Sequence, residues 1–284
     1  MNIGIIGLGL IGGSLGRATK LKTEHTVLGR DKDRDAILKA ELLKAIDSEL
    51  SDGDLGKLDL LIISLPLSAT LKVMKEAVPK LGKGATVIDC CGNKKDVVAE
   101  MKKLAKSYPD IHFAGVHPMA GREWSGISHS SATLFEHSYF ILTPVRASLD
   151  ALTELKNYFS SLGADGTAIA TAEEHDKIIS YTSQLAHIAS SAYVKNPLSE
   201  AHVGFSAGSF RDMTRVAKLD PVMWSELFLK NKENLLENLD VYINHLKEYR
   251  EAIASDDAEK LKSLLADGVK MKEQAERLRR QGLK

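Results

Sequence analysis

A histidine followed by a turn is the part of this chain best suited to proton transfer. His117 opens the run His-Pro-Met-Ala-Gly at 117–121, and Glu123 follows two residues later. The apolar residues 113–116 come directly before it and are typical of a buried strand. An imidazole can accept a proton near neutral pH because its pKa lies close to that value. From these residues His117 is a candidate acid–base group; a solvated histidine at a strand end is the alternative.

Three glycines near the start form a second chemical motif. They have the spacing G-x-G-x-x-G, after apolar residues 3–6 and before an amphipathic stretch. In a strand–turn–helix context this motif binds the pyrophosphate of a dinucleotide, helped by the free N–H groups and dipole of the helix. The alternative is a glycine-rich turn without a ligand. We predict a dinucleotide site built by Gly7, Gly9, Leu10, Ile11 and Gly12.

The residues after the second expected strand bear on the choice of dinucleotide. Asp31 lies about 20 residues after the last glycine, where an acidic side chain hydrogen-bonds the adenosine ribose. A carboxylate there favours NAD because it repels the 2′-phosphate of NADP. Arg30, Lys32 and Arg34 surround it, however, and an arginine of this loop could hold that phosphate. Arg30 could instead stack on the adenine. We expect NAD, with NADP as the alternative.

Ser64 and Pro66 end a further apolar run at the expected height of the cofactor. Small or kinked residues at such a position are suited to line a nicotinamide pocket. A plain strand terminus is the alternative.

The elements that must position these residues follow from hydrophobic periodicity. Short apolar runs predict strands at 3–7, 26–29, 58–65, 85–90, 112–117 and 138–143. Amphipathic stretches between them predict crossover helices at 11–22, 34–43, 69–81 and 94–107. This alternation is typical of an α/β, Rossmann-like doubly wound sheet.

After Pro144 the pattern is almost entirely helical. Helical stretches are expected at 149–162, 173–193, 221–249 and 258–280, with one more short strand within 163–170. We therefore divide the chain into a dinucleotide-binding domain, residues 1–147, and an all-α substrate and dimerisation domain, residues 148–284. Long apolar helices that a small domain cannot bury alone predict a homodimer.

The composition narrows the class of protein. The 284 residues are 44% hydrophobic, and 38 Lys and Arg balance 38 Asp and Glu, which argues against nucleic acid or an anionic membrane as partner. Neither a membrane-length apolar run nor a basic leader is present. The cysteines, Cys90 and Cys91, are adjacent and have no metal-ligand spacing. We expect a cytoplasmic protein with a small-molecule substrate and no metal.

The order of the motifs resembles the prephenate/arogenate dehydrogenase family of tyrosine biosynthesis. The resemblance is carried by GLGLIGGSL at 7–15 and by HPMAG followed by E-x-x-G. Farther on, EEHD at 173–176 is similar to the acidic–His–Asp segment that opens the family's dimerisation helix. SQLAH at 183–187 is similar to its Ser-His-Leu-Pro-His motif, and GSFRDMTR at 208–215 to its Gly-Phe-Arg-Asp-x-Thr-Arg motif. The likeness runs from residue 3 to about 250, and the chain's end soon after its helices leads us to expect no fused regulatory domain.

The resemblance implies an NAD-dependent oxidative decarboxylation of prephenate to 4-hydroxyphenylpyruvate. His117 then resembles the catalytic partner of the substrate hydroxyl, and Glu123 the acid that pairs with an arginine and shapes access. Arg215 resembles the carboxylate ligand, with Arg211 and His187 as further substrate contacts. Simpler interpretations remain: His187 as a core histidine, the two arginines as partners of one structural acid, and His175 as an exposed residue near a helix start.

Two departures from the family pattern concern this site. The family often has a serine that orients the catalytic histidine in a segment Asp-x-x-Ser-x-Lys, but here Gly92 stands at that position. Asn93, Cys91 or a water could take its place. Gln184 and Ala186 replace a histidine and a proline of the Ser-His-Leu-Pro-His motif, which concerns substrate recognition. Alternative functions are an arogenate dehydrogenase, including an NADP-linked one, a β-hydroxyacid dehydrogenase or imine reductase, and a non-catalytic dinucleotide-sensing protein.

Overall fold

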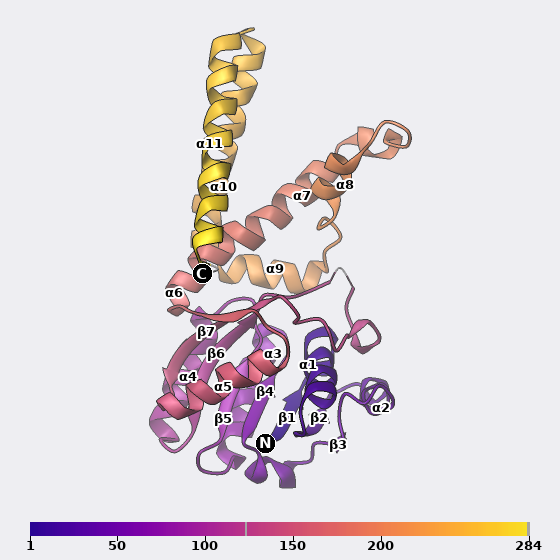
Figure 1. The fold of residues 1–284 in the computed structure, drawn as a ribbon, viewed down its shortest axis with the longest axis vertical. Helices are drawn as coiled ribbons and strands as arrows, with labels where there is room; N and C mark the ends of the chain where they lie inside the picture. Colours follow the sequence, from indigo (N-terminus) through magenta and orange to yellow (C-terminus); the bar gives the residue numbers. More distant parts are fainter. Residues whose placement is uncertain (123, 283–284) are drawn as a thin grey trace. The chain divides into compact units, whose positions relative to one another are not determined.

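The structure is a computed structural model that describes residues 1–122 and 124–282 (Figure 1). By its internal contacts the chain divides into two units, Met1–Lys232 and Glu233–Lys284. The first unit holds the sheet and all the predicted site residues that the structure describes. The second unit is helical.

The first unit is built on an eight-stranded sheet with the order β3-β2-β1-β4-β5-β6-β7-β8. Every neighbouring pair is parallel except β6 and β7, which are antiparallel. The chain moves outward from β1 to β3 and then returns to β4, so the strand order reverses beside β1, where open α/β sheets bind their ligands. The strands are β1 Asn2–Ile6, β2 Thr26–Arg30, β3 Ser48–Glu49, β4 Leu60–Ile63, β5 Thr86–Asp89, β6 His112–Pro118, β7 Tyr139–Arg146 and β8 Gly166–Ile169.

Helices cover both faces of this sheet and explain why its central strands are apolar throughout. Ile5 and Ile62 belong to one buried cluster, whereas the next residues along the strands, Ile6 and Ile63, belong to another on the opposite face. The prediction of a doubly wound sheet is confirmed, with an antiparallel β7 that the sequence did not reveal. The helices are α1 Leu10–Lys22, α2 Arg34–Leu42, α3 Leu67–Ala77, α4 Lys95–Ser107 and α5 Leu149–Ser161.

The remainder of the first unit is helical. The helix predicted over 173–193 is present as α6 Ala172–Ile179 and α7 Ala186–Val194, joined by a π-helical turn over Ser180–Leu185. Two further helices follow, α8 Gly208–Thr214 and α9 Pro221–Lys230. Short 3-10 turns lie at η1 Asp52–Lys57, η2 Val78–Lys80, η3 Ile127–His129 and η5 Pro197–Ala201.

The helical stretch predicted over 221–249 is interrupted at Asn231, so that α9 ends there and α10 Lys232–Ala254 begins. α10 and α11 Ala258–Gly282 make up the second unit, in which the Tyr249 hydroxyl donates to the Leu264 carbonyl at 3.1 Å. In the first unit β8 is a strand of the sheet and α5 packs against the sheet, although both follow residue 147. The domain boundary at 147/148 therefore stays a prediction.

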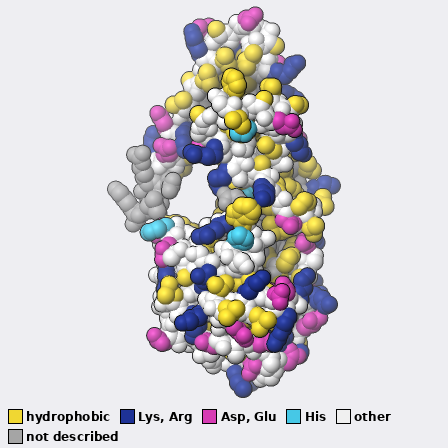
Figure 2. Space-filling model, turned by 90° about the vertical axis from the view of Figure 1, so that its right-hand side faces the viewer, with side chains coloured by type: hydrophobic (Ala, Val, Ile, Leu, Met, Phe, Trp, Pro, Cys, Tyr) yellow, Lys and Arg dark blue, Asp and Glu magenta, His cyan; other side chains and the backbone are white. Residues whose placement is uncertain are grey.

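Two surface properties bear on partners. Among the described residues, no helix has the length and apolar character needed to cross a membrane. Lys and Arg side chains are interspersed with Asp and Glu on the face shown in Figure 2, in keeping with equal totals of basic and acidic residues.

Candidate active site

The carboxyl edge of the parallel strands gathers the predicted cofactor residues. Gly7 follows β1 with a φ of 97°, and its N–H donates to the carbonyl of Arg30 at the end of β2 at 2.8 Å. Asp31 comes next, and its Oδ2 accepts from the N–H of Leu8 at 2.7 Å. The acidic side chain therefore lies against the glycine turn rather than out in solvent.

The three glycines occupy different surroundings. A Cβ on Gly7 would lie 2.2 Å from the Ser64 carbonyl oxygen, and one on Gly12 would lie 1.9 Å from the Gly7 carbonyl oxygen. At Gly9, in contrast, nothing lies within 4 Å of the position of a Cβ. Gly7 and Gly12 thus permit close packing within the protein, whereas the backbone at Gly9 is open to a ligand.

The start of α1 suits an anion. Gly9 is its N-cap and provides no capping side chain, and the first turn holds no acidic residue. Its first N–H groups, including those of Leu10 and Ile11, are therefore available to phosphate oxygens. These features fit a dinucleotide.

The arginines near Asp31 have acidic partners. Arg30 Nη2 lies 2.9 Å from Asp52 Oδ1, and Arg30 Nε donates to the Leu50 carbonyl at 2.9 Å. Arg34 forms an ion pair with Glu49. Both guanidinium groups are therefore engaged on β3 or η1, which weakens the case for a 2′-phosphate site.

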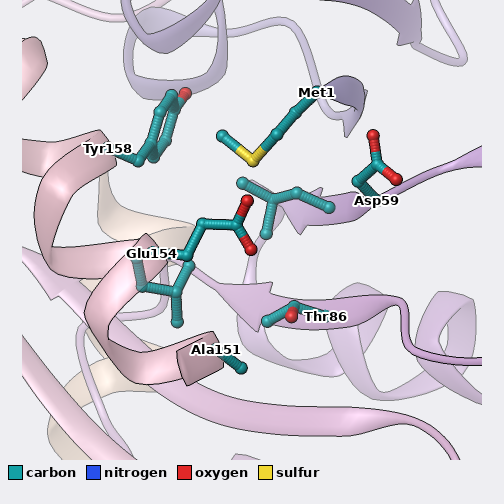
Figure 3. Close-up of a pocket in the computed structure, with 8 residues that line it drawn as sticks. Met1, Asp59, Thr86, Ala151, Glu154 and Tyr158 are labelled. Atoms are coloured by element: carbon teal, nitrogen blue, oxygen red, sulfur yellow. The ribbon is translucent and has the colours of Figure 1, made fainter. Parts of the chain in front are cut away.

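Two predicted nicotinamide-pocket residues follow β4. The N–H of Ser64 donates to the Ile6 carbonyl of β1 at 2.8 Å, and Pro66 directly precedes α3. Both lie between the glycine turn and β6, because β4 and β5 separate β1 from β6 in the sheet. A small depression lined by Met1, Thr86 and Tyr158, among others, lies at the opposite, amino-terminal edge and contains none of these residues (Figure 3).

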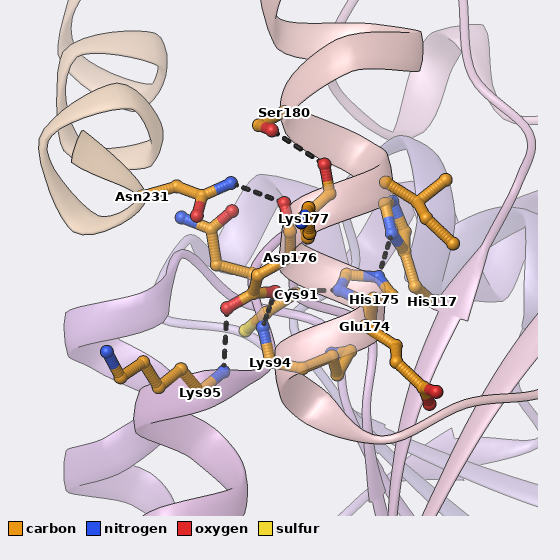
Figure 4. A network of polar contacts seen from close by, with 12 residues as sticks. Cys91, Lys94, Lys95, His117, Glu174, His175, Asp176, Lys177, Ser180 and Asn231 are labelled. Carbon is orange, nitrogen blue, oxygen red and sulfur yellow. Dashed lines mark hydrogen bonds and ion pairs between the residues drawn. The ribbon is translucent and has the colours of Figure 1, made fainter. Parts of the chain in front are cut away.

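His117 lies near the carboxyl end of β6 and is hydrogen-bonded to a second histidine. Its Nδ1 is 2.9 Å from Nε2 of His175, whose Nδ1 is 2.7 Å from Oδ1 of Asp176 (Figure 4). Both α6 residues are buried, with 1% of His175 and 2% of Asp176 exposed. The interpretation of His175 as an exposed residue at a helix start is therefore wrong, because α6 packs this side of its first turns against the sheet domain.

The Asp176 carboxylate is fixed by the start of another helix. Its Oδ1 accepts from the N–H of Lys94 at 2.7 Å, and its Oδ2 accepts from the N–H of Lys95 at 3.0 Å. The N-terminus of α4 leaves such N–H groups without partners in the helix and favours a negative charge. A residue 82 positions away in the chain thus caps α4 and holds His175.

A buried ion pair lies beneath this chain of contacts. The ammonium of Lys94 pairs with Asp89, and both side chains are fully buried. Asp89 also accepts from the N–H groups of Cys91 at 2.8 Å and of Val116 at 3.1 Å. Because Val116 directly precedes His117, this carboxylate fixes the strand end that carries the histidine.

One departure from the family pattern, Gln184, belongs to an interior amide network. Gln184 Nε2 donates to Asn93 Oδ1 at 2.9 Å, and Asn231 Nδ2 donates to Gln184 Oε1 at 2.9 Å and to the Asp176 carbonyl at 2.8 Å. Asn93 in turn donates to the Leu227 carbonyl at 2.8 Å. Gln184 is buried, so its replacement of a histidine concerns packing of α6, α7 and α9 rather than the substrate side.

Asn93 and Cys91, the two side chains considered for orienting His117, form hydrogen bonds with other groups. Asn93 is engaged in the amide network, and the Cys91 thiol faces Thr70 Oγ1 at 3.3 Å. A Cβ on Gly92 would lie 3.2 Å from Leu227 Cδ2, so α9 fills the space beside it. Among the described residues, the hydrogen bond to His117 Nδ1 comes from His175.

The electrostatics of the site favour neutral histidines. Burial, followed by the positive charge of Lys94 and by His175, holds the pKa of His117 well below its ordinary value. Burial also lowers the pKa of His175, against the opposing effect of Asp176. A neutral imidazole has one lone pair with which to accept a proton.

The predicted substrate residues come from α7 and α8. The His187 ring is half-buried, 4.0 Å between centroids from the Trp224 ring, and its Nδ1 lies 2.8 Å from the Ser183 carbonyl oxygen. Burial lowers the pKa of His187, as does the nearby charge of Arg215. Arg215 directly follows α8 and is exposed, and Arg211 is exposed with Asp212 3.9 Å away.

Glu123, the other predicted residue of the site, lies outside the described residues. Among the described residues, no group of three His, Cys, Asp or Glu side chains could hold a metal ion.

Family models match most of the chain. The nucleotide-binding domain of prephenate dehydrogenase matches residues 15–167, and the prephenate dehydrogenase dimerization domain matches residues 171–267. The chain belongs to the prephenate dehydrogenase family. It is accordingly a dehydrogenase with a nucleotide-binding domain. The first match begins after the glycine turn, so the turn is an independent observation.

The chain is also similar to individual proteins of this family. The chain is 32% identical to a prephenate dehydrogenase of Lactococcus lactis, over 96% of this chain and 77% of that one. It is 34% identical to a cyclohexadienyl dehydrogenase of Zymomonas mobilis, over 92% and 91% of the two chains. A crystal structure of prephenate dehydrogenase from A. aeolicus in complex with hydroxyphenyl propionate and NAD+ superposes with a TM-score of 0.82 and 28% identity, covering 97% of this chain and 98% of that one.

Proposed function

We propose that this family member oxidises prephenate with NAD and releases CO2 and 4-hydroxyphenylpyruvate. The observation that carries the proposal is the His117–His175–Asp176 chain, which lies at the same sheet edge as the open glycine turn. A neutral imidazole beside a dinucleotide turn is the arrangement needed to remove a hydroxyl proton while a hydride leaves.

The cofactor residues are assigned by their surroundings. The backbone at Gly9 and the first N–H groups of α1 hold the pyrophosphate, and Asp31 takes the ribose hydroxyls. Ser64 and Pro66 border the nicotinamide. When bound, NAD supplies the hydride acceptor. The pairing of Arg30 and Arg34 with acidic partners supports NAD over NADP.

His117 serves as the acid–base group. It accepts the proton of the substrate hydroxyl as the hydride leaves the ring carbon that bears this hydroxyl. The departing CO2 leaves its bonding electron pair to the ring, which becomes aromatic, and the proton returns to the oxygen. Arg215, with Arg211 and His187, binds the substrate carboxylates, since a guanidinium forms two parallel hydrogen bonds with a carboxylate. For Glu123, which lies outside the described residues, the family resemblance implies a pairing with an arginine.

The finer assignments of assembly and location have separate support. The match to a dimerization domain supports a homodimer, as do the exposed apolar side chains of Leu198, Val203 and Phe205, which lie between α7 and α8. The two free cysteines, one of them buried, support a reducing cytoplasm. Arogenate is the second candidate substrate. Arogenate undergoes the same reaction at the ring as prephenate, and the similarity to a cyclohexadienyl dehydrogenase favours it.

Turnover of prephenate and of arogenate, each with NAD and with NADP, tests the proposal. We expect reduced cofactor to form fastest with prephenate and NAD. His117→Asn should lower kcat by about 100-fold or more, because the proton acceptor is lost. His137→Asn is the control, since His137 is exposed and its left-handed backbone, with a φ of 59°, accepts asparagine. No reduced cofactor in any of the four combinations would contradict the enzyme assignment.

A further inference from the structure

His175 lies next to His117, which we proposed above as the proton acceptor. On the basis of that proposed role, we propose that His175 is a positioning residue that fixes the tautomer of His117. It holds the hydrogen on Nδ1 of His117 and leaves the lone pair of Nε2 directed to the substrate hydroxyl. Among the described residues, none forms a hydrogen bond with that Nε2.

The direction of each hydrogen bond follows from its partner. Both oxygens of the Asp176 carboxylate accept from backbone N–H groups of α4, and a carboxylate has no hydrogen to donate to His175. His175 Nδ1 must then carry a hydrogen. In the neutral ring Nε2 is left with a lone pair only, so the contact at 2.9 Å requires His117 Nδ1 to donate.

The arrangement is rigid because three separate elements contribute to it. The start of α4 holds Asp176, and His175 lies on α6. On β6, the Val116 N–H donates to Asp89 and so fixes the backbone next to His117. Burial of His175 and Asp176 excludes water that could compete for these hydrogen bonds. This chain has Gly92 where the family pattern has a serine, so it lacks that hydroxyl. His175 thereby orients His117 in its place.

Two substitutions separate this role from a purely structural one. An asparagine amide at position 175 reaches about as far as Nδ1 of the histidine, and a glutamine amide about as far as Nε2. His175→Asn therefore keeps the contact to Asp176 and loses the one to His117. His175→Gln retains an acceptor for His117 Nδ1 and loses the contact to Asp176.

We expect kcat for prephenate to fall about 10- to 100-fold in His175→Asn, with the KM for NAD unchanged, and to recover most of the loss in His175→Gln. A structural role predicts the reverse order, because the asparagine variant preserves the buried contact to Asp176. Equal kcat values for the wild type and His175→Asn would overturn the proposal.

Nitrogen-15 NMR of histidine-labelled protein at pH 8 provides a measurement that does not depend on turnover. The His117 signals, assigned by their loss in His117→Asn, should show hydrogen on Nδ1 and none on Nε2. In His175→Asn the two tautomers should be mixed. Hydrogen on Nε2 of His117 in the wild type would overturn the inference, whereas a protein with the expected tautomer but no turnover would contradict only the proposed function.

Discussion

Individual side chains in this protein act through the group that fixes them as much as through their own chemistry. His117 is the residue type that the sequence predicts for proton transfer, but its usefulness depends on which ring nitrogen carries hydrogen. That choice is made by His175, and the position of His175 is set by Asp176. Burial, and after it the ammonium of Lys94, lowers the pKa of both imidazoles and so favours their neutral forms.

The role of Arg215 can be tested by its effect on substrate binding. Arg215→Ala should raise the KM for prephenate by about 10- to 100-fold, because a charge-assisted hydrogen bond contributes about 1.5–3 kcal/mol. The KM for NAD should not change. Arg215→Lys restores the charge but not the planar pair of donors, so it should recover only part of the affinity. An unchanged KM for prephenate in steady-state kinetics of Arg215→Ala would rule out the carboxylate role.

Among the secondary-structure elements, the turn between β1 and α1 combines a packing requirement with an opening for ligand. Gly12 lies against the Gly7 carbonyl, whereas the position of a Cβ on Gly9 faces open space. Two glycines of one motif thus serve different purposes, although the sequence presents them alike.

Alanine substitutions should separate these two purposes. Gly9→Ala should leave the free energy of unfolding within about 0.5 kcal/mol of the wild type, since its Cβ meets nothing within 4 Å. It should nevertheless weaken NADH binding about 10-fold or more, because the methyl group occupies the approach to the pyrophosphate. Gly12→Ala should lower the free energy of unfolding by about 1–3 kcal/mol, because its Cβ would overlap a backbone oxygen.

Urea unfolding and a fluorescence titration with NADH measure the two effects. Normal NADH affinity in a folded Gly9→Ala protein would place the pyrophosphate elsewhere.

For the molecule as a whole, the buried neutral histidines couple folding to pH. The pKa values of His117 and His175 are lowered in the folded protein, so the unfolded chain binds more protons below its histidine pKa of about 6.5. The stabilising contribution is complete above that pH and is lost as the pH falls toward the lowered values. Acidification below pH 6.5 should therefore destabilise the first unit.

The free energy of unfolding should decrease by up to about 1.4 kcal/mol per pH unit for each of these two histidines below pH 6.5. Urea unfolding at pH 7.5, 6.5 and 5.5 measures the slope, followed by tryptophan fluorescence, since Trp124 and Trp224 both lie in the first unit. His117→Asn should reduce the slope, and the exposed control His137→Asn should not. A flat profile would mean that the site histidines are not neutral and buried in solution.

Much of this molecule was predictable from local patterns. Apolar runs, amphipathic stretches and glycine spacing depend on neighbouring residues, so the strands, the crossover helices and the turn at Gly7 agree with the structure to within a few residues. The break at Asn231 was not predictable, because its reason is a side chain bonded to Gln184 and to the Asp176 backbone on other helices.

The chemistry at His117 was suggested by residue types, but its support was not. Hydrogen bonds from His117 to His175 and from the Lys94 N–H to Asp176 join residues 58 and 82 positions apart. Such contacts depend on which face of α6 is buried and on how α4 begins, and local periodicity specifies neither. Residue types therefore determined that a proton acceptor and a dinucleotide turn were present. The packing of α4, α6 and β6 decided how that acceptor is oriented, because hydrogen-bond direction is set by groups that only folding brings together.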